Sequence, residues 1–586
     1  MKKLLVAVLV LCLALSMVPA FALELISGAD TYPVETDKTI TWYAQGNLNP
    51  HEKFADWKES PFHTGLSRET GVNIEWMFPT TGTDGGVYTN TLLADPNNLP
   101  NIMWFPGMND ASQYLEDEII WDLTPYLKEY APAYYAFLKA HPAYDKAMKT
   151  DDGKYYGFGF FREDGGWNDS YRGPVVRKDW LDECGLEMPE TISEFENVIR
   201  VFNEKYGAKF SFAWSRFQDG GLEGAFGAYG CSGLIYSVKD GEVGVAQTTE
   251  GWRSYVSWLN QLFEDGLFDQ DNFSLDDTSI KAKIHNGECG ISMTSMGQLN
   301  NWMKEAAAAG SDENWVAIKY PTDDDGNISC IFGGLGIGTW TSVVTKCTDE
   351  ETMKLCLRAL DYAYTQEGFL YWNYGTKGVS WDYDAEGKPA FTALVTEDTD
   401  TDPMIKYNGA TWSGSCIQAT NLLYLKNSQV AIDANDLWFY SVPAKVSSGW
   451  KWPSGTTFTV AESDELALIA ANLGTYSSES FANFVTGVKD IDDDSVWESY
   501  LAAYESQYNL ERFLEIRQAC YDRYLERLSK RFRRRVLRLT AEKGNAGGTC
   551  VRTASRIFKS TKPILEIKVG FFHDYRNEKK GNDPEP

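Results

Sequence analysis

The chain has 586 residues, of which 43% are hydrophobic, and a net charge of −29 at neutral pH. A chain of this length exceeds one hydrophobic core, which predicts two or more lobes. The negative charge excludes nucleic acid as the main partner, because phosphate backbones attract basic surfaces. Charge is uneven along the chain: from Arg527 to Pro586, sixteen Lys and Arg accompany six Asp and Glu, a net charge of +10.

The N-terminus has the pattern of a secretory signal peptide. Two lysines precede an apolar run from Leu4 to Val18, and the sequence PAFA that follows predicts cleavage after Ala22. The run is too short for a membrane span. We therefore expect a mature protein outside the cytoplasm. Its nine cysteines, Cys12 having been removed, contain no C-x-x-C motif, which disfavours a disulfide framework or a zinc site.

Strand-like and helix-like segments alternate along the next part of the chain. TITWY (Thr39–Tyr43), NIEWM (Asn73–Met77) and NIMW (Asn101–Trp104) predict strands, with helical patterns between and after them. Apolar stripes at helical spacing predict later helices over Gly251–Phe263 and Thr348–Phe369. Such alternation predicts an α/β lobe with a mainly parallel sheet.

The segment from Gly173 to Phe202 combines a charged cluster with strong helix signals. GPVV predicts a strand, and Lys178–Cys184 predicts a short helix that ends at Gly185. Thr191 and Glu194 then form the T-x-x-E capping box of a second helix. We interpret the charged residues of the RKDW sequence between strand and helix as helix caps and surface rather than as a catalytic cluster.

This segment resembles the R-K-D-W-L-x-x-x-G-x-x-x-P-x-T-x-x-E segment of extracellular solute-binding proteins. These are the sugar-type receptors of ABC importers, with the large type 2 periplasmic-binding-protein fold. Further similar segments follow in the family's order: NIMWF (Asn101–Phe105), DGKYYGFG (Asp152–Gly159), EDGLFDQDNF (Glu264–Phe273), NGECGISM (Asn286–Met293), LDYAYTQEGFLYWNYG (Leu360–Gly375) and NLERFLEIRQACYDRYLER (Asn509–Arg527). The resemblance spans about Thr39 to Arg527.

The resemblance implies two α/β lobes, each a mainly parallel sheet flanked by helices, joined by a hinge around a ligand cleft. We expect a signal peptide at 1–22, lobe 1 at 23–170 and again at 331–400, lobe 2 at 171–330, mainly lobe 2 and C-terminal helices at 401–528, and a basic, disordered tail at 529–586. The tail has no counterpart in the family pattern, and a partner-binding role for it stays open. Lipid anchoring is disfavoured, because Cys12 lies inside the apolar run.

Ligands of open α/β sheets bind beyond the carboxyl ends of the strands. Aromatic rings there cover the apolar face of a pyranose, while polar side chains bond its hydroxyl groups. Arg172 also suits the carboxylate of a uronic sugar. The expected ligand-binding residues are Trp42, Tyr43, Asn47, Trp104, Asn109, Trp167, Asp169, Tyr171, Arg172, Thr294, Met296, Trp372, Trp381 and Trp412.

We therefore expect a monomeric extracytoplasmic protein that captures an oligosaccharide by closure and delivers it to the membrane permease of an ABC importer, with no cofactor or metal. A glycoside-hydrolase-like enzyme stays open, because 83 acidic residues offer many carboxylate pairs. A receptor for another solute, such as a peptide, also stays open. The chain contains no H-E-x-x-H or G-x-S-x-G motif, and DQDN (Asp269–Asn272) lacks the remaining spacing of a calcium loop.

Overall fold

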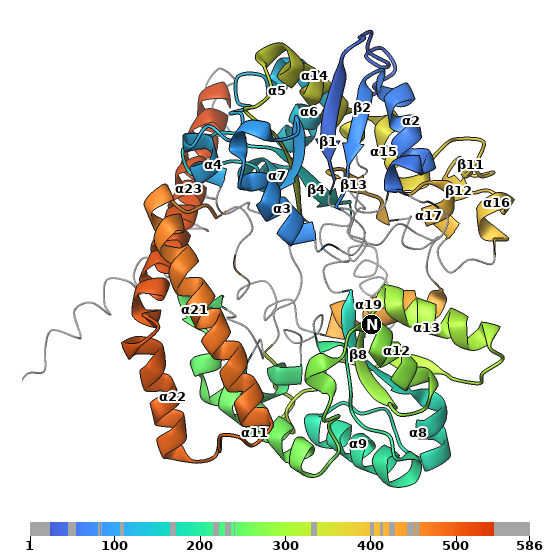
Figure 1. The fold of residues 1–586 in the computed structure, drawn as a ribbon, viewed down its shortest axis with the longest axis vertical. Coiled ribbons are helices and arrows are strands. Elements are labelled where there is room, and N and C mark those ends of the chain that lie inside the picture. Colours follow the sequence, from blue (N-terminus) through green and yellow to red (C-terminus); the bar gives the residue numbers. More distant parts are fainter. Residues whose placement is uncertain are drawn as a thin grey trace, which may run out of the picture. The chain divides into compact units, whose positions relative to one another are not determined.

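The computed structural model describes residues 24–44, 54, 56–79, 83, 85–105, 111–163, 171–214, 222–228, 236–239, 241–329, 337–398, 403–410, 414–420, 428–441, 452 and 456–543 (Figure 1). None of the helices in these ranges combines the length and the apolar composition that a membrane span requires.

A six-stranded sheet forms the centre of the first lobe. Its strands in spatial order are β13 (Ile417–Gln418), β4 (Phe158–Arg162), β10 (Ile337–Val344), β3 (Ile102–Phe105), β1 (Thr39–Tyr43) and β2 (Asn73–Met77). The predicted strands TITWY and NIEWM are confirmed, and they pair in parallel from Thr39 with Asn73 to Tyr43 with Met77. Ile40, Ile102 and Val344 are fully buried in this lobe.

Helices on this sheet complete what we call lobe 1. They are α2 (Pro61–Thr70), α3 (Gly85–Leu93), α4 (Ala111–Glu116), α5 (Leu127–Tyr130), α6 (Pro132–Ala140), α7 (Pro142–Ala147), α14 (Glu350–Asp361) and α15 (Gln366–Tyr374). A small hairpin of β11 (Trp381–Tyr383) and β12 (Pro389–Phe391) follows α15, with α16 (Ala393–Thr396) and α17 (Pro403–Tyr407) after it.

A three-stranded sheet forms the centre of lobe 2, in the spatial order β8 (Ile291–Ser295), β5 (Arg172–Arg177) and β9 (Trp315–Ala317). Its helices are α8 (Lys178–Cys184), α9 (Ile192–Tyr206), α11 (Glu250–Glu264), α12 (Asp277–His285), α13 (Met296–Ala308) and α19 (Gln429–Ser441). A separate hairpin pairs β6 (Tyr236–Lys239) with β7 (Glu242–Val245). Helix α19 contacts β5, β9 and α13, so it belongs to lobe 2 although it follows β13 in the chain.

The prediction that each sheet is mainly parallel is confirmed for lobe 1, where three of the five strand pairings are parallel, and is wrong for lobe 2. In lobe 1, β1 is parallel to β2 and β3 and β13 is parallel to β4, while β10 runs antiparallel to both β3 and β4. In lobe 2, β5 is antiparallel to both β8 and β9. Alternating patterns reveal local strand–helix units, but β10 enters its sheet from the other lobe. Its direction is therefore set by a long-range connection that local periodicity does not report.

Up to α19, the described elements pass between the lobes three times: β4 leads to β5, β9 leads to β10, and β13 leads to α19. The polypeptide thus leaves lobe 1, returns to it and leaves it again. Each lobe is assembled from segments distant in sequence, as in hinge-closing binding proteins.

The helices after the RKDW cluster form as predicted. Gly185 adopts a left-handed conformation (φ 66°) directly after α8, and a side chain other than glycine is strained there. Helix α9 begins at a complete capping box: Thr191 Oγ1 accepts from the Glu194 N–H, and the Glu194 carboxylate accepts from the Thr191 N–H. The sequence therefore specified this strand–helix–helix unit locally.

The helix predicted over Thr348–Phe369 is divided in two. Helix α14 ends at Asp361, a 3₁₀ turn follows, and α15 starts after Thr365. Thr365 adopts an extended conformation and its hydroxyl accepts from the Gly368 N–H. The apolar stripe continues across the break because both helices pack on the same core, so periodicity alone did not reveal the new N-cap.

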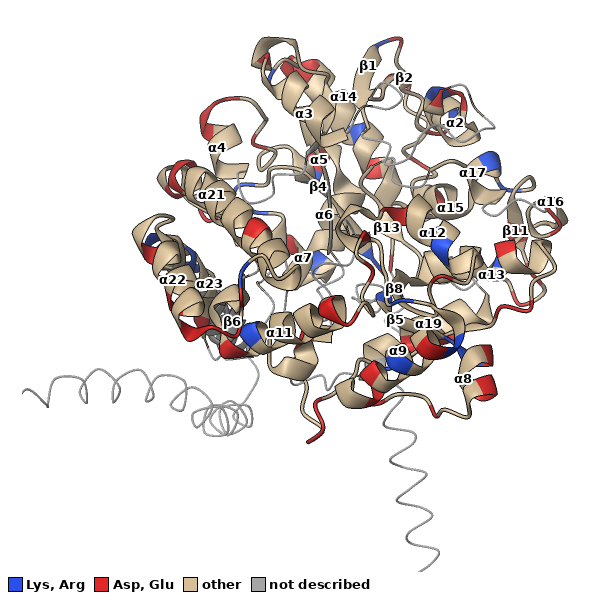
Figure 2. Ribbon diagram, turned by 60° about the horizontal axis from the view of Figure 1, so that its bottom comes forward, with Lys and Arg blue, Asp and Glu red and all other residues tan. Residues whose placement is uncertain are grey.

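The chain ends in long helices α21 (Val460–Val485), α22 (Asp494–Ser506) and α23 (Leu510–Lys543). Internal contacts separate a main unit, Met1–Gln518, from a C-terminal unit, Ala519–Pro586, so the boundary lies within α23. Helix α23 includes the first part of the segment predicted as a disordered tail, whereas 544–586 lie outside the described residues. Figure 2 shows Asp and Glu distributed over many helices, in keeping with the acidic composition.

Candidate functional site

Two of the expected aromatic residues lie at the carboxyl ends of neighbouring strands in lobe 1. Trp42 pairs in parallel register with Ile102, and Trp104 follows two residues later on β3. Because side chains alternate across a strand, Trp42 and Trp104 share one face of the sheet. Trp42 stacks on Trp76 with ring centroids 4.9 Å apart. This is the edge of the sheet where open α/β folds place ligands.

Trp372 is brought to the same place from α15. Its ring lies 4.5 Å from that of Phe62. Gly414, just before β13, lies between the two tryptophans: a Cβ there would be 3.3 Å from Trp372 and 3.6 Å from Trp42. The absence of a side chain at Gly414 therefore allows the chain to pass close to both indoles. Three residues that are distant in sequence, Trp42, Trp104 and Trp372, thus occupy one region of lobe 1.

Polar atoms without partners distinguish this region. The indole Nε1 atoms of Trp104 and Trp372 and the Thr341 hydroxyl are buried and have no hydrogen-bond partner within the part of the chain that the structure describes. A buried polar group left unsatisfied costs about 1–3 kcal/mol, so such groups are rare without a reason. Two of them, on Trp104 and Trp372, lie in the region of lobe 1 that holds Trp42, whereas Thr341 pairs with Phe105 and its side chain is therefore on the opposite face of the sheet.

Thr341 is a residue that the sequence analysis missed. It lies on β10, where it pairs with Phe105 at the end of β3. In the sequence it belongs to a plain strand pattern, TSVV, that carries no binding signal. Only the antiparallel return of β10 places it at this edge.

A buried histidine near the tryptophan cluster was also missed. The His63 ring lies 4.6 Å from the Trp76 ring, and its Nδ1 is 2.6 Å from the Ser60 hydroxyl. Its Nε2 has no hydrogen-bond partner among the described residues. Burial lowers the pKa of His63 to about 3, so the ring is neutral at physiological pH.

Two other expected residues use their polar atoms within lobe 1. The Tyr43 hydroxyl is 2.9 Å from the Thr89 hydroxyl, on the opposite face of the sheet from Trp42. The Trp381 Nε1 donates to the Gly375 carbonyl at 2.9 Å, and its ring packs 5.8 Å from that of Tyr374. Both side chains are buried, which is the typical environment of core aromatics.

The expected residues of lobe 2 meet at one end of its sheet. Arg172 pairs with Ser295, and the Met296 N–H donates to the Tyr171 carbonyl at 2.7 Å. Thr294 and Met296 are buried, and the Thr294 hydroxyl donates to Gln298 Oε1 at 3.2 Å. The Arg172 guanidinium lies 5.7 Å from the Tyr171 ring and is half-buried. The structure thus groups these four residues directly after the β4–β5 connection.

Five expected residues cannot be placed in this description. Asn47, Asn109, Trp167, Asp169 and Trp412 lie outside the described residues. Their assignment to the ligand site stays a prediction.

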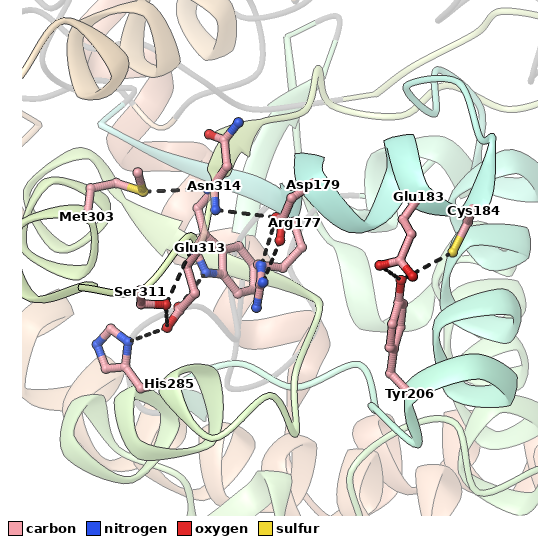
Figure 3. A network of polar contacts seen from close by, with 11 residues as sticks. Arg177, Asp179, Glu183, Cys184, Tyr206, His285, Met303, Ser311, Glu313 and Asn314 are labelled. Atoms are coloured by element: carbon pink, nitrogen blue, oxygen red, sulfur yellow. Dashed lines mark hydrogen bonds and ion pairs between the residues drawn. The ribbon is translucent and has the colours of Figure 1, made fainter. Parts of the chain in front are cut away.

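The RKDW cluster connects the end of strand β5 to the start of helix α8 (Figure 3). Arg177 donates to both Asp179 oxygens at 2.9 and 2.5 Å (Figure 3). Its guanidinium lies 4.4 Å from the Trp180 ring. Burial would raise the pKa of Asp179, but the hydrogen bonds and charge of Arg177 outweigh it and lower that pKa. Asp179 also accepts from the Asn314 N–H at 3.3 Å. The interpretation as caps and surface is wrong for Arg177, which is buried because strand β5 ends inside the lobe.

Acidic side chains near candidate metal-binding segments have other partners. Asp269 of the DQDN sequence is 2.9 Å from the Lys283 ammonium, which neutralises it as a calcium ligand. His285 lies 3.3 Å from Glu313 (Figure 3) and 3.3 Å from Glu305. Within the described ranges, no three His, Cys, Asp or Glu side chains are arranged to hold a metal ion.

Comparison with known proteins gives sequence relatives of similar length. No family model matches the chain. The fructooligosaccharide ABC transporter substrate-binding protein FusA of Streptococcus pneumoniae is 24% identical over 517 residues, which cover 84% of this chain and 92% of the relative. The polygalacturonan/rhamnogalacturonan-binding protein YtcQ of Bacillus subtilis is 24% identical over 373 residues, covering 61% of this chain and 69% of the relative.

Solved structures share the fold. The crystal structure of the alginate-binding protein AlgQ2 without calcium ion superposes with a TM-score of 0.68 and 20% identity, covering 83% of this chain and 99% of that one. FusA in complex with kestose superposes with a TM-score of 0.67 and 22% identity, covering 84% and 100% of the two chains. These similarities confirm the expected two-lobed α/β fold.

Proposed function

We propose that this chain, whose homologues are the substrate-binding proteins of ABC transporters and whose fold is that of solute-binding proteins, captures a carbohydrate between its lobes and delivers it to an ABC importer. The proposal includes export to the extracytoplasmic space after cleavage behind Ala22, action as a monomer, docking on membrane permease subunits and release of the ligand without chemical change.

The observation that carries the proposal is the group of unsatisfied donors among tryptophan rings in lobe 1. Trp104 and Trp372 combine flat apolar surfaces with buried indole N–H groups that have no partner in the described chain. A pyranose matches both, because its C–H face packs on an aromatic ring and its hydroxyl oxygens accept from N–H and O–H groups. A purely apolar ligand would leave the donors unpaired.

Contacts from lobe 2 are needed to complete the site. A neutral hydrogen bond contributes only about 0.5–1.5 kcal/mol net, whereas micromolar affinity corresponds to about 8 kcal/mol. One lobe therefore binds weakly, and residues such as Tyr171 and Arg172 add their contacts when the lobes approach. This requirement couples binding to closure.

A panel of oligosaccharides tests the proposal by thermal shift. Kestose, galacturonan oligomers and alginate oligomers represent neutral and acidic sugars. We expect at least one class to raise the melting temperature, since a ligand at a hundred times its Kd stabilises the folded state by about 2.7 kcal/mol. The proposal fails if peptides shift the melting temperature and no glycan does.

Two further experiments distinguish a binding protein from an enzyme, and a receptor for acidic sugars from one for neutral sugars. Incubation of the bound glycan with the protein should release no product by chromatography, whereas release would favour the enzyme alternative. If acidic oligomers bind, Arg172→Gln should weaken them far more than it weakens neutral ones, because a guanidinium pairs bidentately with a carboxylate. Equal losses would exclude a carboxylate-binding role of Arg172.

A further inference from the structure

Helix α21 contacts both lobes. Near its N-terminus it contacts α4 of lobe 1, and just before the helix the Thr457 hydroxyl donates to Asp151 Oδ1 at 2.8 Å. Near its C-terminus the Phe481 ring stacks on Trp214 of lobe 2 at 5.2 Å, and the Val485 carbonyl accepts from Asn260 Nδ2 at 3.1 Å. Its 26 residues span about 39 Å, which suits a strap between the lobes (Figure 1).

The middle of α21 has the lowest intrinsic helix propensity of the helix, although Tyr476 there donates to the Tyr500 carbonyl at 3.2 Å. The first half, VAESDELALIAANL, is rich in Ala, Leu and Glu, which favour helices. Gly474 then begins the sequence GTYSS, in which every residue has a lower helix propensity. The Thr475 hydroxyl also donates to the Ala471 carbonyl at 3.0 Å, a bond of the kind that bends helices.

Neither packing nor backbone conformation accounts for Gly474. A Cβ at this position would meet no heavy atom within 4 Å, and the backbone does not have a positive φ. Gly297 at the start of α13 is likewise without close neighbours, but two other helical glycines differ: a Cβ at Gly65 would lie 2.2 Å from the Tyr371 hydroxyl, and one at Gly368 would lie 1.7 Å from the Tyr362 carbonyl. Those glycines are required by close neighbours, whereas the effect of Gly474 is to lower the local stability of the helix.

We infer that Gly474 is the flexible point of α21, about which the helix bends when the lobes move. Its N-terminal half stays bound to lobe 1 and its C-terminal half stays bound to lobe 2. A rigid helix with both contacts would resist closure. The inference rests on the proposed function, because closure around a ligand is the motion that the bending accommodates.

Gly474→Ala tests this inference, with Ser478→Ala as the matched control. Ser478 is exposed on the same helix, so its replacement favours the helix without removing a glycine. Hydrogen exchange should slow at residues 474–478 of Gly474→Ala by about fivefold, the factor equivalent to the ~1 kcal/mol difference between Gly and Ala. Single-molecule FRET between dyes on unnatural residues at Lys128 in lobe 1 and Glu204 in lobe 2, both exposed, then reports the motion of the lobes.

We expect the free Gly474→Ala protein to show a narrower FRET distribution than wild type, and any ligand-induced shift to be smaller. Ser478→Ala should match wild type. An unchanged distribution in Gly474→Ala, or exchange as fast as in wild type, overturns the inference. If no glycan shifts the FRET of wild type, the proposed function fails, but the comparison of the free proteins still decides the role of Gly474.

Discussion

At the scale of single residues, the state of the indole N–H separates two kinds of tryptophan. Trp372 and Trp381 are both buried in lobe 1, and both were expected in the ligand site. The N–H of Trp381 is bonded to a carbonyl, whereas the N–H of Trp372 has no partner in the described chain. The bonded donor of Trp381 stabilises the fold, whereas the unbonded donor of Trp372 contributes no hydrogen bond among the described residues.

Replacement of these tryptophans by phenylalanine tests the distinction. Trp372→Phe keeps an aromatic ring but removes the N–H, so carbohydrate affinity should fall about three- to tenfold. Through the donor itself, the free energy of unfolding should rise by about 1–3 kcal/mol, because the replacement removes a buried N–H that is unbonded in the free protein. Isothermal titration calorimetry measures the affinity and denaturant unfolding measures the stability.

Trp381→Phe is the matched comparison. It removes a donor whose acceptor, the Gly375 carbonyl, is buried, so it should lower the free energy of unfolding by about 1 kcal/mol and leave sugar affinity unchanged. If affinity were instead lost in Trp381→Phe and kept in Trp372→Phe, Trp381 rather than Trp372 would be the tryptophan that binds the ligand.

At the scale of elements, helix ends explain where the chain changes direction. Helices α9 and α21 both start at capping boxes, with Thr191 and Thr459 as the N-caps. The capping box at the start of α9 follows the short helix α8. It fixes the place where the chain turns for the second time after strand β5. Local side-chain to backbone bonds thus position the part of lobe 2 that follows the interlobe connection.

Loss of the α9 cap should have a measurable cost. Thr191→Ala removes the hydroxyl that accepts from the Glu194 N–H, so the free energy of unfolding should fall by about 1 kcal/mol. Thr191→Ser keeps a hydroxyl and should retain most of the wild-type value. Equal stability of Thr191→Ala and wild type in urea unfolding would mean that tertiary contacts alone hold this helix end.

At the scale of the whole molecule, two buried groups couple stability to pH in opposite directions. Burial lowers the pKa of His63 to about 3, and burial raises the pKa of Asp361 to about 7. The folded protein therefore holds both groups neutral between about pH 4 and 6.5, while the unfolded chain has a charged His and a charged Asp. Unfolding in this window takes up one proton and releases another, so the two contributions to the pH slope cancel.

Replacing one of the two buried groups should reveal the pH dependence of stability that the other group contributes. The pKa of His63 is lower in the folded than in the unfolded protein. Its contribution to the free energy of unfolding is therefore fully present above pH 6.5 and is lost as the pH falls. The pKa of Asp361 is higher in the folded than in the unfolded protein. Its contribution to the free energy of unfolding is therefore fully present below about pH 4 and is lost as the pH rises toward 7. Relative to wild type, His63→Asn should become less stable with rising pH and Asp361→Asn more stable, each by about 1.4 kcal/mol per pH unit.

Urea unfolding at several pH values between 4.5 and 6.5 measures these slopes. Their comparison with wild type removes the contribution of all other titratable groups. Parallel curves for the three proteins would show that neither buried group changes its protonation on unfolding.

Several elements of the fold have local causes and could be predicted from the amino-acid sequence. The strands TITWY and NIEWM, helix α8 with its terminal glycine, and the capping box of α9 depend on side-chain alternation, backbone freedom and bonds across one turn. An ordered set of such segments also sufficed for the two-lobed fold. Signals that act within a few residues can be read without knowledge of distant neighbours.

Only the tertiary structure decided which residues meet. The antiparallel return of β10 places Thr341 beside the end of β3, and Gly414 lies next to both Trp42 and Trp372. Burial of Arg177 and the neutral state of His63 likewise depend on what surrounds them. Strand direction, desolvation and the pairing of polar atoms are set by contacts between segments far apart in the chain, and no local pattern reports them.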